Sequence, residues 1–99
     1  MGKTIFTISY DVIPEKRSDY LDLAHEMTDH LTRVRGKNYS IYEQKGKPNS
    51  FSEVFICNTS QEYDQLEDDQ DERTEQLINR LEEYLVSGKM RYSTMVEID

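Results

Sequence analysis

The chain has 99 residues, 32% of them charged and 35% hydrophobic, which predicts one soluble domain over residues 1–99 and excludes a membrane span of about 20 apolar residues. The formal charge of −8 argues against nucleic acid as a partner, because phosphate binding requires clustered Lys and Arg. Cys57 is the single cysteine, so we expect a reducing, cytoplasmic environment and no internal disulfide.

The N-terminal third predicts a strand and then a helix. Hydrophobic alternation over residues 4–10 is typical of a strand, and its core face is expected to carry Phe6, Ile8 and Tyr10. The helix that follows is expected to begin at Pro14 or at Ser18. Its buried stripe is predicted to contain Tyr20, Leu23, Ala24, Met27, Leu31 and Val34. The helix is expected to end near Gly36, where three cations would interact favourably with the negative end of the helix dipole: Arg33, Arg35 and Lys37.

Two further alternating runs, residues 39–45 and 51–58, predict a hairpin. A turn centred on Pro48-Asn49 would place Tyr42 opposite Phe55. The neighbouring register would set two glutamates directly opposite each other, which is unfavourable. The face toward the helices is then expected to carry Ile41, Val54 and Ile56. The other face is expected to carry Tyr42, Gln44, Glu53, Phe55 and Cys57.

The C-terminal third predicts a second helical region and a last strand. Residues 60–83 contain ten acidic residues and two basic ones, which we interpret as solvated helix surface. Ser60 is expected to cap a short helix that the polar run 67–72 interrupts. The main helix is expected to bury Leu77, Ile78, Leu81, Tyr84 and Leu85. Alternation over residues 90–98 predicts the closing strand.

The order β-α-β-β-α-β predicts a ferredoxin-like α+β fold, in which both helices cover one face of a four-stranded antiparallel sheet. The other face stays bare, and its aromatic and polar side chains are typical of an interface or a ligand cavity. We therefore expect a homodimer that forms through the open sheet face.

Four segments carry a resemblance to a known superfamily. They are the strand exit Asp11-Val12-Ile13-Pro14-Glu15, the helix Asp19–Val34, the hairpin end Phe55–Glu62 and the closing strand Tyr92–Ile98. Over essentially its whole length the chain resembles the dimeric α/β barrels of the antibiotic-biosynthesis-monooxygenase-like superfamily. The resemblance implies pairing of two sheets into a barrel, and the superfamily includes small oxygenases without metal, haem-degrading enzymes and many proteins of unknown role. The haem-degrading members use a Trp, which this chain lacks.

Glu53 and His30 are the candidate catalytic residues. Glu53 stands between Phe51 and Phe55 on its own strand face, so we expect partial desolvation and a raised pKa suited to proton abstraction. His30 lies at the edge of the helical stripe, where it could reach a pocket or be held by a hydrogen bond. The residues expected to contact a small aromatic ligand in the barrel are Tyr42, Phe55 and Arg91.

No metal and no cofactor is expected. The run Asp68–Asp71 offers oxygens but lacks the spacing of a calcium loop, and His25 with two neighbouring aspartates lies on one helix face without an enclosing shell. Cys57 is interpreted as a packing residue, because no histidine is near it in sequence. Two functions stay open. One is a homodimeric binding or interaction protein, and the other is a small cofactor-independent monooxygenase-like enzyme that acts on an aromatic molecule.

Overall fold

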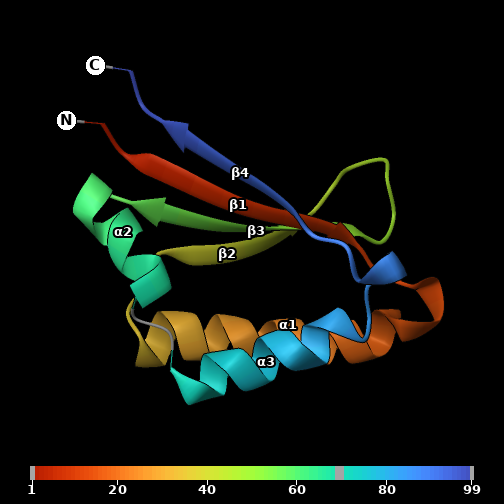
Figure 1. Cartoon of the computed structure of the whole chain (residues 1–99). Coiled ribbons are helices and arrows are strands. Elements are labelled where there is room, and N and C mark those ends of the chain that lie inside the picture. Colours follow the sequence, from red (N-terminus) through yellow and green to blue (C-terminus); the bar gives the residue numbers. More distant parts are fainter. Residues whose placement is uncertain (1, 69–70, 99) are drawn as a thin grey trace.

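The computed structural model describes residues 2–68 and 71–98. Its four-stranded antiparallel sheet has the order β2-β3-β1-β4. The strands are β1 (Thr4–Asp11), β2 (Tyr39–Glu43), β3 (Ser50–Cys57) and β4 (Arg91–Val96). The α-helices are α1 (Arg17–Asp29), α2 (Ser60–Asp68) and α3 (Glu72–Glu82). Helices α1 and α3 run side by side along one face of the sheet, and α2 lies near the end of β3 (Figure 1). The predicted ferredoxin-like fold is confirmed.

The first helix follows the prediction until its last turn. Pro14 opens a short 3-10 turn, η1 (Pro14–Lys16), that leads into α1. The buried stripe contains Tyr20, Leu23, Ala24, Met27 and Leu31, as expected. Val34 is 70% exposed, so its predicted burial is wrong. The reason is a π-helical turn, η2 (His30–Val34), in which the Arg35 N–H donates to the His30 carbonyl at 3.0 Å and the helical period widens.

The hairpin loop contains two consecutive turns where the sequence predicts one. The expected turn at Pro48-Asn49 is present, because the Ser50 N–H donates to the Lys47 carbonyl at 3.2 Å. A second turn precedes it: the Lys47 N–H donates to the Gln44 carbonyl at 3.2 Å, and Gly46 adopts a φ of +81° that favours glycine. The additional turn removes residues from the strand ladder and moves the register.

The observed register therefore corrects the predicted one. Tyr39, and not Tyr42, lies opposite Phe55, a shift of three residues. Glu53 pairs with Ile8 of β1 on the side of the sheet that faces the helices. The helix-facing residues of β3 are Phe51, Glu53, Phe55 and Cys57, and the prediction that put Val54 and Ile56 there is wrong. Glu53 and Phe55 consequently lie on the opposite face from the one expected.

The interruption of the second helical region is confirmed, since α2 ends at Asp68 and α3 begins at Glu72. The cap of α2 is one residue earlier than expected, because Thr59 Oγ1 accepts a hydrogen bond from the Glu62 N–H at 3.1 Å. Asp71 caps α3 by accepting from the Thr74 N–H at 3.0 Å. The buried stripe of the last helical region contains Leu77, Leu81 and Leu85, with Ile78 and Tyr84 half-buried.

The two faces of the sheet differ in character. The helix-facing side meets α1 and α3 in a core whose largest fully buried side chains include Tyr10, Tyr20, Leu23 and Leu81. The open side carries a Ser9–Ser52 hydroxyl pair at 2.8 Å and exposes Tyr42 and Met95. Strand β4 is exposed at all 6 of its residues. No helix within residues 2–68 and 71–98 is long and apolar enough to cross a membrane.

Candidate active site

A cavity of about 220 Å³ lies between the sheet and the helices. Its wall is mostly apolar, with Phe6, Ile8 and Phe55 from the sheet and Met27, Leu77 and Leu81 from the helices. Five side chains add polar groups to this wall: Arg35, Lys37, Glu53, Thr74 and Tyr92. An apolar space with a few polar groups is typical of a small-molecule site.

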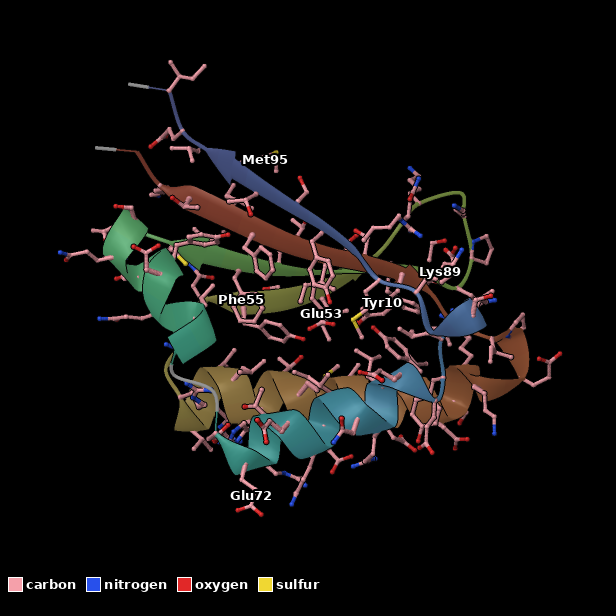
Figure 2. All side chains as sticks on the ribbon, viewed as in Figure 1. Tyr10, Glu53, Phe55, Glu72, Lys89 and Met95 are labelled. Atoms are coloured by element: carbon pink, nitrogen blue, oxygen red, sulfur yellow. The ribbon has the colours of Figure 1, made fainter. Side chains whose placement is uncertain are left out.

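Glu53 is the buried acid of this cavity. The residue is 5% exposed, and its side chain points from β3 into the layer between the sheet and the helices (Figure 2). Its Oε1 accepts a hydrogen bond from the Tyr39 hydroxyl at 2.7 Å. Its Oε2 is buried and has no hydrogen-bond partner among the described residues. One carboxyl oxygen is thus held by Tyr39, and the other is buried without a hydrogen bond from the described residues.

The proton affinities of this site follow from burial. Desolvation raises the pKa of the Glu53 carboxyl, and the hydroxyls of Tyr39 and, more weakly, Tyr10 only partly oppose that rise. Burial and the nearby Glu53 carboxylate raise the pKa of the Tyr39 hydroxyl, which therefore stays a donor. Burial also raises the pKa of Tyr10, whose hydroxyl lies 2.8 Å from that of Tyr20. Within this group, Glu53 is the one carboxyl, and burial makes it hold a proton more tightly than a solvent-exposed carboxyl does.

The predicted site residues divide into two groups. Glu53 and Phe55 line the cavity together. Tyr42 is 59% exposed on the open face, and Arg91 lies on the same face with its Nη1 3.8 Å from Asp11 Oδ2. Because the sheet separates these two from Glu53, the predicted ligand contacts of Tyr42 and Arg91 cannot belong to the same pocket as Glu53.

His30 is not among the residues that line the cavity, and it makes a structural contact with Asp71 instead. Its Nε2 is 2.8 Å from Asp71 Oδ2, and its side chain is 12% exposed. Arg35 Nη1 approaches the other oxygen of Asp71 at 3.4 Å. His30 therefore connects the end of the first helical segment to the cap of α3, which corresponds to the hydrogen-bonded alternative expected for a boundary histidine.

The predicted site omits Tyr39, whose hydroxyl holds Glu53, and the cavity-lining cations Arg35 and Lys37. Tyr39 would have emerged from a correct hairpin register, because it pairs with Phe55 two positions from Glu53. From the sequence, the two cations are expected to interact with the negative end of the helix dipole, and that role alone does not indicate a cavity.

The metal candidates gain no support. Across the described parts of the chain, no group of three or more His, Cys, Asp and Glu side chains is placed to hold a metal ion. Asp69 and Gln70 of the acidic run lie outside the described residues. Cys57 is buried, and desolvation raises the pKa of its thiol, as is typical of a packing residue.

Solved structures with the same fold have very different sequences. A putative antibiotic biosynthesis monooxygenase from Caulobacter crescentus matches with a TM-score of 0.81 and 10% identity, covering 99% of this chain and 92% of that one. A NIPSNAP family protein from Agrobacterium tumefaciens matches with a TM-score of 0.77 and 15% identity, covering 98% of this chain and 87% of that one. SnoaB, a cofactor-independent oxygenase from Streptomyces nogalater, matches with a TM-score of 0.75 and 8% identity, covering 98% of this chain and 94% of that one. No family model and no curated protein matches the sequence.

Proposed function

We propose that this chain, which has the fold of antibiotic biosynthesis monooxygenase structures, is a small cofactor-independent oxygenase-like enzyme whose aromatic substrate occupies the cavity beneath the sheet. The observation that carries the proposal is Glu53 Oε2, a buried carboxyl oxygen beside an apolar cavity that has no hydrogen-bond partner within residues 2–68 and 71–98. An unsatisfied buried polar group costs about 1–3 kcal/mol of stability. A substrate hydroxyl would supply the missing partner.

The size and walls of the cavity support an aromatic substrate. An apolar cavity of about 150 Å³ can hold benzene, so the observed volume of about 220 Å³ suits a molecule of about one or two fused rings. The walls already contain stacked rings, since Phe6 and Tyr92 lie 6.1 Å apart at an interplanar angle of 12°. Ring edges and faces of this kind favour an aromatic partner.

The proposed reaction begins with proton transfer. The Glu53 carboxylate accepts the proton of a substrate phenol, whose pKa is near 10, and a raised carboxyl pKa narrows the gap between the two groups. The phenolate then reduces dioxygen. One oxygen atom enters the ring carbon para to the hydroxyl, and the other leaves as water with the ring hydrogen and the phenolic hydrogen. A phenol and dioxygen thus give a quinone and water, and the substrate supplies all the electrons.

Oxygen uptake with 1-naphthol and other one- and two-ring phenols tests this function. Glu53→Gln keeps the size of the side chain but cannot accept the proton, so we expect turnover to fall by about 10²-fold or more. Glu83→Gln, at an exposed position, is the matched control and should leave turnover unchanged. Equal turnover in the wild type and Glu53→Gln would contradict the proposed role of Glu53. Failure of the phenols to bind would contradict the assignment of the cavity.

We also propose that the protein acts as a homodimer. The supporting observation is the exposure of β4 at all 6 residues, because an edge strand with free backbone groups and exposed apolar side chains favours a partner. Met95 points away from the helix layer, on the side opposite Glu53 (Figure 2). A second copy of the chain on this face would cover Met95 and Tyr42 without blocking the cavity.

A further inference from the structure

Among the described residues that line the cavity with Glu53, Tyr92 is the one that is exposed. Its exposed fraction is 64%, whereas the other lining residues are buried or half-buried. Tyr92 pairs with Ile8, and Ile8 pairs with Glu53 on its other side, so all three side chains lie on the helix-facing side of the sheet. The cavity therefore meets the solvent beside Tyr92.

Two neighbouring wall residues hold the Tyr92 side chain in place. Its ring stacks against that of Phe6, with the ring centroids 6.1 Å apart and an angle of 12° between the planes. Its hydroxyl donates a hydrogen bond to Met90 Sδ at 3.4 Å. Phe6 and Met90 also line the cavity, and both are half-buried. The Tyr92 ring thus forms part of the wall and does not project freely into the solvent.

The wall that α3 provides belongs to the packed core. Leu77 and Leu81 are 2% and 1% exposed, and close packing leaves such side chains little room to move. Tyr92, in contrast, is held by one stacked ring and one weak hydrogen bond to sulfur. The space available to a ligand at this end of the cavity therefore depends mainly on the side chain at position 92.

We propose that Tyr92 is a specificity-determining residue of this cavity, whose ring covers the solvent-facing end and limits an aromatic ligand to about two fused rings. The proposal rests on the proposed function, since it names the residue that sets the substrate size of the same site. A third ring would extend into the position of the Tyr92 ring. The proposed dimer leaves this end accessible, because Tyr42 and Met95 lie on the other side of the sheet.

Calorimetric titration with 1-naphthol, which has two rings, and 9-phenanthrol, which has three, tests this limit. Tyr92→Ala removes the ring, so the affinity for 9-phenanthrol relative to that for 1-naphthol should rise at least about tenfold, a difference of about 1.4 kcal/mol. Tyr92→Phe keeps the ring and should keep the wild-type ratio. Tyr42→Ala is the matched control, because it removes a tyrosine that is 59% exposed on the open face, and it should also keep the wild-type ratio.

The outcomes separate the role of Tyr92 from that of the cavity. A ratio that rises no more in Tyr92→Ala than in Tyr42→Ala would overturn the role of Tyr92, and binding of 1-naphthol in the same titration would leave the cavity proposal intact. A rise in Tyr92→Phe equal to that in Tyr92→Ala would also overturn it, because the ring would then not be the barrier. If the wild type binds neither phenol, both proposals are overturned.

Discussion

Glu53 combines features that folding alone does not favour. Its carboxyl is buried among aromatic and aliphatic side chains, and one oxygen has the Tyr39 hydroxyl as a partner while the other has none among the described residues. The raised pKa means that the folded protein holds the Glu53 proton more tightly than the unfolded chain does. This difference couples the stability of the protein to pH.

The first prediction concerns Glu53→Gln and pH. Between the unfolded pKa of about 4.5 and the higher folded pKa, the folded state binds more protons, so the wild type loses stability as pH rises through this window. Below the window the stabilising contribution of the protonated form is fully present. The free energy of unfolding of Glu53→Gln should therefore increase relative to that of the wild type as pH rises from 4.5 to the folded pKa. The increase should be up to about 1.4 kcal/mol per pH unit within this window. Urea unfolding at a series of pH values measures it, and a difference independent of pH would contradict it.

The second prediction concerns Tyr39→Phe. This change removes the hydroxyl that donates to Glu53 Oε1 and leaves both carboxyl oxygens without that partner. We expect a loss of about 1–3 kcal/mol in the free energy of unfolding. The pKa of Glu53 should also rise, because the lost hydrogen bond lowers it in the wild type. The acidic limb of any pH–rate profile, which reports the general base, should therefore move to higher pH. Tyr42→Phe, on the open face, should change neither quantity, and equal effects of the two variants would refute this role of Tyr39.

At the scale of elements, the sequence predicts what depends on local periodicity. The stripe Tyr20–Leu31, the interruption between the two C-terminal helices and the turn at Pro48-Asn49 are all confirmed. Each of them needs only the spacing of apolar residues or the chemistry of a turn. The element order, and with it the fold class, could therefore be predicted.

The hairpin register and the face of β3 could not be predicted, because they depend on contacts beyond the local pattern. Both alternating sets of residues in β3 contain apolar side chains. Because one set contains the acid Glu53, its sequence pattern favours the solvent-facing side for that set. The pairing of β3 with β1 places that set on the helix side. The additional turn at Gln44–Lys47 then sets the register of β2. Of the three predicted ligand contacts, Phe55 therefore lies on the helix side with Glu53, and Tyr42 and Arg91 lie on the open side.

The third prediction concerns Asp71, which connects α3 to the end of the first helical segment. It caps α3 and contacts both His30 and Arg35 near the end of the first helical segment. Asp71→Ala should lower the Tm by several degrees at pH 7, and Asp71→Asn should lower it less, because Asn can still cap a helix. The hydroxyl of Thr74, followed by weaker contributions from His30, holds the pKa of Asp71 below its usual range.

The depressed pKa gives this prediction a pH dependence. The contribution of the Asp71 carboxylate is present above the unfolded pKa of about 3.9 and is lost as pH falls toward the lower folded value. The Tm difference between the wild type and Asp71→Ala should therefore narrow below about pH 4. Glu75→Gln, an exposed acid in the same first turn, is the control. A Tm difference equal to that of the control would refute the connecting role.

At the scale of the whole molecule, the sheet separates the cavity from the face that we propose as the dimer interface. The helix-facing side holds the cavity with Glu53, and the open side with Met95 is the proposed dimer interface. A change on the open side should therefore alter assembly without altering ligand binding. This separation distinguishes the present arrangement from a barrel lumen in which the partner would complete the pocket.

The fourth prediction uses this separation. Met95→Glu places a charge on the open face, so sedimentation velocity should show a dimer for the wild type and a monomer for the variant. Val34→Glu introduces the same charge at a site that is 70% exposed at the end of η2 and should remain a dimer. The variant Met95→Glu should still bind 1-naphthol. A monomeric wild type at micromolar concentration would refute the proposed dimer.

The buried carboxyl of Glu53 also has a meaning for the history of this chain. Random substitution of this residue by Gln, Leu or Met would remove the cost of burying an acid, so mutational drift without selection for function would tend to erase it. We therefore expect relatives that keep the proposed function to keep an acid at this position, and relatives that have lost it to carry an uncharged side chain there.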